Sequence, residues 1–145
     1  KIASILTIAP GASAYFKGGV ITYADEMKTA MLEIDADLIA EKTAVCEEVA
    51  RGMVEGANRL FSTDYAVAAT GFAGPGGPDA KTGIRVGTIW VAAGREGHIL
   101  TRCLTDDEGR DHNILKASAA AVHLLLEILK ADAADEDADA DIATF

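Results

Sequence analysis

The 145-residue chain contains only two cysteines and three histidines. Cys46 and Cys103 lie far apart in segments of periodic apolar residues, which favours buried free thiols in a reduced, cytoplasmic compartment over a disulfide. His98, His112 and His123 occur singly, and no cysteine or histidine cluster has the spacing of metal ligands. We therefore expect neither a disulfide nor a metal site.

Long apolar runs and a basic excess are lacking too. No run approaches the ~20 residues of a transmembrane helix, and no signal-peptide pattern is visible, so we expect no membrane partner. Six of the 23 acidic residues and none of the 13 basic ones lie in 131–145. The mild charge of the remaining residues excludes a global field that attracts nucleic acid, although one local arginine can still hold a phosphate.

What is present is enough apolar sequence for one folded domain, since 50% of the residues are hydrophobic. Hydrophobic periodicity predicts helices at 1–9, 25–32, 44–61 and 111–130, and a linker with a helical turn at 35–43. Short β-rich runs predict strands at 18–24, 65–70, 84–94 and 98–105, the last two as an antiparallel hairpin. The alternation of helices and strands predicts an α/β fold, a three-layer α/β/α sandwich with a mixed β-sheet.

The two ends of the chain differ from the middle. The helical pattern is already under way at Lys1 with no capping residue before it, so we expect further residues upstream. Residues 1–130 form the expected domain. Residues 131–145 form an acidic, low-complexity tail that is disordered or weakly helical by composition.

A glycine-rich loop, "ATGFAGPGG" at 69–77, directly follows the strand expected at 65–70. Such loops let backbone N–H groups approach an anion, and Thr70 adds a hydroxyl at the carboxyl end of the strand, where ligands bind in open α/β sheets. The loop is neither a P-loop nor a dinucleotide fingerprint. Its glycine content alone fits a demanding turn without a ligand equally well.

A second stretch, "PGASAYFKGGVITYADEMK" at 10–28, places a serine, a tyrosine and a lysine at the corners of a turn, a strand and a helix. Taken singly, Ser13 fits a turn residue, Tyr23 fits strand packing and Lys28 fits a solvated helix face. Arg110, just before the last helix, fits a surface residue. None of the four indicates a function by itself.

Together the two stretches resemble the signatures of the C-terminal domain of the CinA (competence-damage-inducible) family, the nicotinamide mononucleotide deamidases. "AVCEEVARGMVEGA" resembles the helix between the signatures, and the resemblance covers about residues 1–130. Two departures lie in the first signature, where Ala12 replaces a Ser and Ala24-Asp25 replaces Ser-Asn. The family also carries a Glu-Ser-Cys-Thr-Gly-Gly segment ahead of the position of Lys1.

The resemblance implies an amidohydrolase that converts nicotinamide mononucleotide and water to nicotinic acid mononucleotide and ammonia, in pyridine-nucleotide recycling. It also implies a homo-oligomer that needs no metal or other cofactor. Ser13 matches the proposed nucleophile and Lys28 the general base, with Tyr23 beside them. Thr70, Gly71 and Arg110 match residues that hold the nucleotide.

The chemistry behind this assignment makes a geometric demand. A lysine base must be neutral, whereas a free lysine with a pKa of ~10.4 is charged, so burial or a nearby cation such as Arg110 or Lys17 has to assist. Backbone N–H groups near Gly18-Gly19 or in the 74–77 loop are candidates for an oxyanion hole. We expect Ser13 Oγ and Lys28 Nζ to lie within hydrogen-bond reach or one water apart. The alternative is a non-catalytic nucleotide-binding or oligomerisation module.

Overall fold

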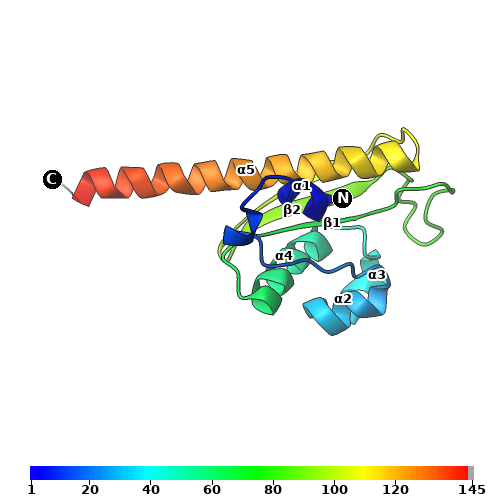
Figure 1. Ribbon diagram of the computed structural model, residues 1–145. Helices are drawn as coiled ribbons and strands as arrows, with labels where there is room; N and C mark the ends of the chain where they lie inside the picture. The colour runs from blue at the N-terminus through cyan, green and yellow to red at the C-terminus, as the bar shows by residue number, and fades with distance from the viewer. Residues whose placement is uncertain (144–145) are drawn as a thin grey trace.

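Two helices cover opposite faces of a three-stranded sheet in the computed structural model, which describes residues 1–143 (Figure 1). The strands are β1 (Ala66–Gly71), β2 (Ile89–Arg95) and β3 (His98–Leu104), in the order β1-β2-β3. Helix α4 (Glu47–Phe61) packs on one face and helix α5 (Arg110–Ala143) on the other. This arrangement confirms the expected three-layer α/β architecture.

Both pairings in the sheet are antiparallel, with Thr70 opposite Trp90 in the first ladder and Trp90 opposite Cys103 in the second. The residues that the structure describes therefore supply no parallel pairing of the kind expected in a mixed sheet. The hairpin expected from the sequence is β2–β3. Strand β2 begins later than predicted because Gly87, at φ 93°, turns the chain where an added Cβ would lie 2.9 Å from the Asp107 Cα.

The strand expected at 18–24 is wrong, because this segment is extended but pairs with no described strand. Val20 packs against the cluster formed by α2, α3 and α4, while Ile21 is 91% exposed. The Thr22 carbonyl, which a ladder would use, instead accepts a hydrogen bond from Lys28 Nζ at 2.7 Å. The β-branched composition therefore predicts the extended backbone correctly but not its partner.

The core follows the alternation of β2, whose successive side chains point to opposite faces of the sheet. Val91 and Ala93 face α5, where they join Ala121 and Ile128. Ala92 faces α4. A third cluster, which includes Leu32, Ile39 and Val49, joins α4 to the two short helices beside it.

Four short elements complete the fold. They are α1 (Ile2–Leu6), the 3₁₀ turn η1 (Ala12–Ala14), α2 (Asp25–Leu32) and α3 (Ala36–Lys42). Helix α2 has the bounds predicted from the sequence. Helix α3 replaces the expected linker, because Asp35 caps it by accepting a hydrogen bond from the Asp37 N–H. Helix α4 starts three residues later than predicted, because Thr43 adopts φ 64° and Cys46 is the N-cap.

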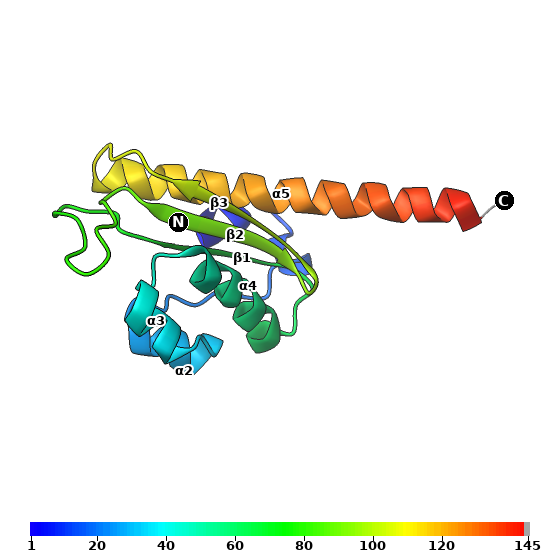
Figure 2. The same cartoon turned by 180° about the vertical axis from the view of Figure 1, so that it is seen from behind.

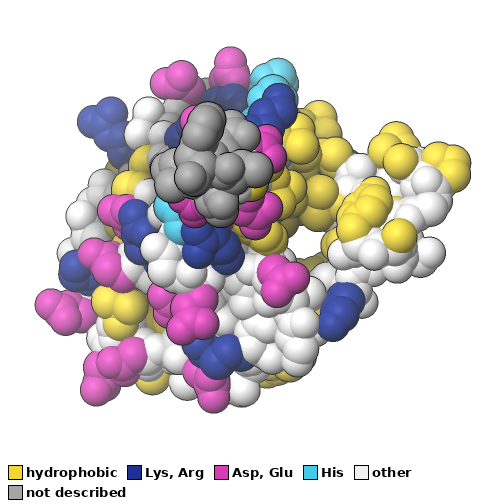
Figure 3. All heavy atoms as spheres, turned by 90° about the vertical axis from the view of Figure 1, so that its left-hand side faces the viewer, with side chains coloured by type: hydrophobic (Ala, Val, Ile, Leu, Met, Phe, Trp, Pro, Cys, Tyr) yellow, Lys and Arg dark blue, Asp and Glu magenta, His cyan; other side chains and the backbone are white. Residues whose placement is uncertain are grey.

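The acidic tail continues α5 as a helix as far as Ala143, beyond the edge of the sheet (Figures 1 and 2). Of the two expected alternatives, disordered or helical, the helix is the one observed; residues 144–145 lie outside the described part. Figure 3 shows acidic and basic side chains intermingled around this end of the molecule. None of the helices within 1–143 combines the length and apolar character that crossing a bilayer requires.

Candidate functional site

The carboxyl end of β1 is shaped by close contact with β2. A Cβ at Gly71 would lie 2.8 Å from the Ile89 Cβ, so only glycine fits there without movement. Beyond it, the Phe72 N–H donates to the Thr88 carbonyl at 3.0 Å and the Gly87 N–H donates to the Phe72 carbonyl at 2.7 Å. The glycine loop starts at this pair of hydrogen bonds.

Thr70 lies at the end of β1 as predicted, but its hydroxyl faces the connection between α3 and α4. The side chain is buried, and Oγ1 donates to the Ala44 carbonyl at 2.8 Å. A hydroxyl used in this way fixes the start of α4 against the sheet. Its role in holding a nucleotide therefore stays a prediction.

Lys28 is the most unusual charged residue of the region, because this residue of α2 is almost fully buried, at 7% exposure. Its Nζ donates to the Thr22 carbonyl at 2.7 Å and to the Tyr23 carbonyl at 3.5 Å, and it lies 3.8 Å from Asp25 Oδ1. Lysine is seldom buried unless it is paired, so these acceptors account for its position. The solvated helix face that Lys28 fits when it is taken singly is not observed.

Tyr23 and Arg110 meet next to the glycine loop. The Arg110 guanidinium donates to the Gly74 carbonyl at 2.7 Å and approaches the Tyr23 hydroxyl at 3.5 Å. Both side chains are exposed, Tyr23 to 81%. Tyr23 thus connects the buried lysine, through its carbonyl, to the arginine, through its ring. The structure brings Lys28, Tyr23, Arg110 and the loop into one neighbourhood.

Ser13 lies apart from this group, exposed in η1. The segment after it is fixed to the far end of α4, because Lys17 Nζ donates to the Ser62 carbonyl and Gly18 lies against the Phe61 ring. That end of α4 leads into the start of β1. Lys28 is linked through Tyr23 and Arg110 to the loop that follows the end of β1, and a six-residue strand spans about 20 Å. Figures 1 and 2 show η1 and α2 well separated.

Two expectations are therefore not met in the described residues. No hydrogen bond joins Ser13 to Lys28. The expected oxyanion hole at Gly18 and Gly19 is also not beside Lys28, because these glycines lie near Ser13. Lys17, a candidate cation for Lys28, instead donates to carbonyls at the end of α4. The sequence does not specify the direction of the extended segment 18–24. In the structure this segment leads the chain away from Ser13, so Tyr23 and Lys28 lie at its far end.

Asn113 is a polar residue of this region that sequence reasoning missed. It lies in the first turns of α5, is 0% exposed, and donates from Nδ2 to the Ala73 carbonyl at 3.1 Å. It also donates to Asp107 Oδ1 at 2.9 Å and accepts from the Glu108 N–H at 2.9 Å. An asparagine near a helix start is common in sequences, so only its position beside Arg110 gave a signal.

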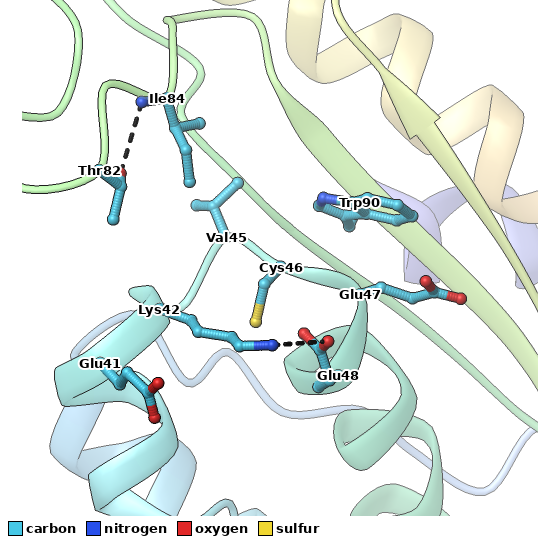
Figure 4. A pocket seen from close by; sticks show the side chains of 9 residues that line it. All are labelled: Glu41, Lys42, Val45, Cys46, Glu47, Glu48, Thr82, Ile84 and Trp90. Atoms are coloured by element: carbon cyan, nitrogen blue, oxygen red, sulfur yellow. Dashed lines mark hydrogen bonds and ion pairs between the residues drawn. The ribbon is translucent and has the colours of Figure 1, made fainter.

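Two shallow cavities flank the end of the sheet. One, of about 450 Å³, lies against the glycine loop and is lined by Gly76, Arg85 and Asp107 among others. The other, of about 480 Å³, lies between α3, α4 and β2 (Figure 4). Lys81 donates to the Ala40 carbonyl and so ties the loop before β2 to α3 beside this cavity. Neither cavity is lined by Ser13 or Lys28.

The larger cavity has an acidic wall and one aromatic wall. Lys42 pairs with Glu48 at 3.0 Å, and Figure 4 shows the Cys46 thiol beside this pair and Trp90 across from it. Burial raises the pKa of Cys46, which keeps the thiol protonated. A hydrogen bond from Thr101 and, with a smaller effect, hydrogen bonds from Arg51 lower the pKa of Glu47.

Both cysteines are free thiols, as predicted. Neither is fully buried, because Cys46 is half-buried and Cys103 is exposed on the edge strand β3. Within the described residues, no three histidine, cysteine, aspartate or glutamate side chains are placed to hold a metal ion.

Comparison with known proteins gives consistent matches. The profile of the CinA C-terminal domain matches residues 1–129. A CinA-like protein of Mycolicibacterium gilvum is 42% identical over 130 residues, which cover 88% of this chain and 30% of that protein. A CinA-like protein of Cytophaga hutchinsonii is 35% identical over 89% of this chain and 30% of its own length. The chain thus spans about 30% of the length of these relatives.

Solved structures agree in fold. The competence/damage-inducible protein CihA of Agrobacterium tumefaciens superposes with a TM-score of 0.80 at 33% identity, over 87% of this chain and 76% of that one. The competence damage-inducible protein A of Klebsiella pneumoniae superposes with a TM-score of 0.81 at 30% identity, over 89% of this chain and 79% of that one.

Proposed function

The chain belongs to the CinA C-terminal domain family, and from this premise we propose that it hydrolyses the carboxamide of nicotinamide mononucleotide, releasing ammonia and nicotinic acid mononucleotide. The observation that carries the proposal is the buried amine of Lys28, linked through Tyr23 to Arg110 and the glycine loop. A buried, basic side chain beside an anion-binding loop is a typical arrangement for acid–base chemistry on a phosphorylated substrate.

Each part has a chemical role in the proposal. Amide hydrolysis needs a base that takes a proton from the nucleophile and later returns it to the departing amine. Lys28 performs both transfers once it has given up a proton and its hydrogen bond to Thr22. Arg110, held at the loop by the Gly74 carbonyl, provides the positive charge for the nucleotide phosphate.

The Ser-Lys mechanism requires Ser13 to reach Lys28. Ser13 is assigned as nucleophile by its position in the family signature, yet it lies at the opposite end of the extended segment from Lys28. Ser13 takes this role only if it comes to Lys28, within the chain or from a second copy of it. The serine and the lysine therefore need separate tests.

The decisive experiment measures ammonia released from nicotinamide mononucleotide by the full-length protein. Lys28→Met should lower kcat by about 10²–10⁴-fold, the usual contribution of a general base. Lys130→Met, a change at an exposed lysine of α5, is the matched control and should leave kcat unchanged. No release by the wild-type protein contradicts the activity. Undiminished release by Ser13→Ala removes the serine from the mechanism but leaves the lysine in it.

A second candidate is a nucleotide-binding module without catalysis, favoured by the separation of Ser13 from Lys28. Calorimetry distinguishes the two functions. Binding of nicotinamide mononucleotide with no ammonia release over hours supports the module, and release in the same sample supports the enzyme.

A further inference from the structure

Two side chains at the start of α5 donate hydrogen bonds to two successive carbonyls of the glycine loop. Asn113 Nδ2 donates to the Ala73 carbonyl at 3.1 Å, and Arg110 donates to the Gly74 carbonyl at 2.7 Å. The last backbone hydrogen bonds before this point belong to Phe72. From Ala73 to Pro78 the described residues supply no further hydrogen bond, so these two side chains fix the position of the loop.

The two side chains differ in how firmly they are themselves held. Arg110 is exposed and is free to leave the Gly74 carbonyl for a ligand. Asn113 is completely buried, and its three hydrogen bonds use both amide hydrogens and the carbonyl oxygen. A fully satisfied buried amide has one low-energy orientation, because any rotation leaves a buried group without a partner.

The Asn113 contacts fall into two sets. The bond to Asp107 and the bond from the Glu108 N–H stabilise the approach to α5. The Asn113 amide first, and then the Gly109 N–H, lower the pKa of Asp107 by donating to its carboxyl. The bond to Ala73 is different because it reaches another segment, 40 residues away in the chain. The first set is ordinary capping, whereas the second transmits the position of α5 to the loop.

We propose that Asn113 is a positioning residue, which holds the Ala73 carbonyl so that the backbone N–H groups of the loop glycines at 74, 76 and 77 and the Arg110 guanidinium keep one geometry toward a bound phosphate group. Its consequence for activity rests on the function proposed above. Its consequence for the loop does not, and the two are measured separately.

The test exchanges the side chains of Asn113 and Asp107. Asn113→Asp keeps the acceptor for Glu108 but loses both donors and places two carboxylates face to face. The double variant Asp107→Asn/Asn113→Asp restores a donor–acceptor pair between these positions but supplies none to the Ala73 carbonyl. Asp132→Asn, which weakens α5 at a distance from the loop, controls for a general loss of stability.

Hydrogen exchange of the full-length protein is read at the Phe72 and Gly87 amides, which close the base of the loop. The double variant should regain most of the thermal stability that Asn113→Asp loses, yet both amides should still exchange about tenfold faster than in the wild type. The KM for nicotinamide mononucleotide should rise about tenfold with kcat within about twofold, the pattern of lost ground-state binding.

Two outcomes overturn the proposal. Wild-type exchange at both amides in the double variant shows that Asn113 acts only as a cap. Equally fast exchange in Asp132→Asn shows that the loop follows global stability. If exchange responds as expected but no variant, including the wild type, releases ammonia, then the loop assignment stands and the proposed reaction fails.

Discussion

Helix α4 offers a sharp test of how closely α2, the helix of Lys28, must approach it. Gly56 and Gly52 lie one turn apart in α4, and each lacks the side chain that would raise helix propensity. Replacing either glycine with alanine should gain about 1 kcal/mol of helix propensity. The contacts that the new methyl group meets are different at the two positions.

A Cβ at Gly56 would lie 2.9 Å from the Leu32 Cα and closer still to the Leu32 carbonyl oxygen. Backbone atoms cannot avoid the new methyl group by changing a rotamer, so α2 must shift. Overpacking of this kind lowers the free energy of unfolding by about 3 kcal/mol. The net expectation for Gly56→Ala is a loss of about 2 kcal/mol. A Cβ at Gly52 would meet only the tip of the Ile34 side chain, at 2.7 Å. A changed rotamer costs about 1 kcal/mol, so Gly52→Ala should be close to neutral.

Urea denaturation measures the difference directly. With a slope of about 2 kcal/mol per M, the midpoint of Gly56→Ala should fall about 1 M below that of Gly52→Ala. Because the displaced helix carries Lys28, ammonia release by the folded Gly56→Ala protein should fall as well. Equal midpoints for the two variants would refute the reasoning, since they would show that α2 moves away without cost.

Three further predictions follow from single contacts. The hydrogen bond from Arg95 is the largest of the contacts that lower the pKa of Asp132 well below its ordinary value of 3.8. The ionised carboxylate therefore stabilises the fold fully above about pH 4, and this stabilisation is lost as the pH falls below that value. Asp132→Asn should therefore lower the Tm at pH 7, and its deficit relative to the wild type should shrink below about pH 4. Arg110→Ala should raise the KM for nicotinamide mononucleotide about tenfold or more, because a charged hydrogen bond to phosphate is lost. Desolvation by neighbouring atoms raises the pKa of both thiols, so alkylation at pH 7 should be slow, and Cys103, the more exposed of the two, should react before Cys46.

The parts of the fold that the sequence predicted are those that depend on local patterns. Helix α2 and the β2–β3 hairpin were predicted from a short helical segment and from two adjacent β-rich runs, because each encodes its own geometry. The segment 18–24 failed as a strand for the opposite reason. A ladder needs a neighbour, and residues far away in sequence determine whether Val20 and Ile21 find one.

The candidate site shows the same division. The family signatures led to Lys28, Tyr23 and Arg110, and the structure brings these three together. The pairing of Ser13 with Lys28 required a direction of the chain between them, which no local signal specifies. Asn113 was missed because its significance lies in a partner 40 residues earlier in the chain.

The acidic tail shows that composition alone can hide a tertiary signal. Its low complexity indicated a disordered or weakly helical segment, yet Asp132 is 5% exposed and forms hydrogen bonds with Tyr65, Arg95 and His98. The buried row of α5 runs through Ala117, Ala121, Leu124 and Ile128, and the next position in the row, four residues on, is Asp132. An acidic residue that continues a buried row must find donors on the opposing surface, because an unpaired carboxylate does not stay buried. The position of Asp132 in the row therefore predicts a docked helix, where the count of acidic residues predicts a solvated tail.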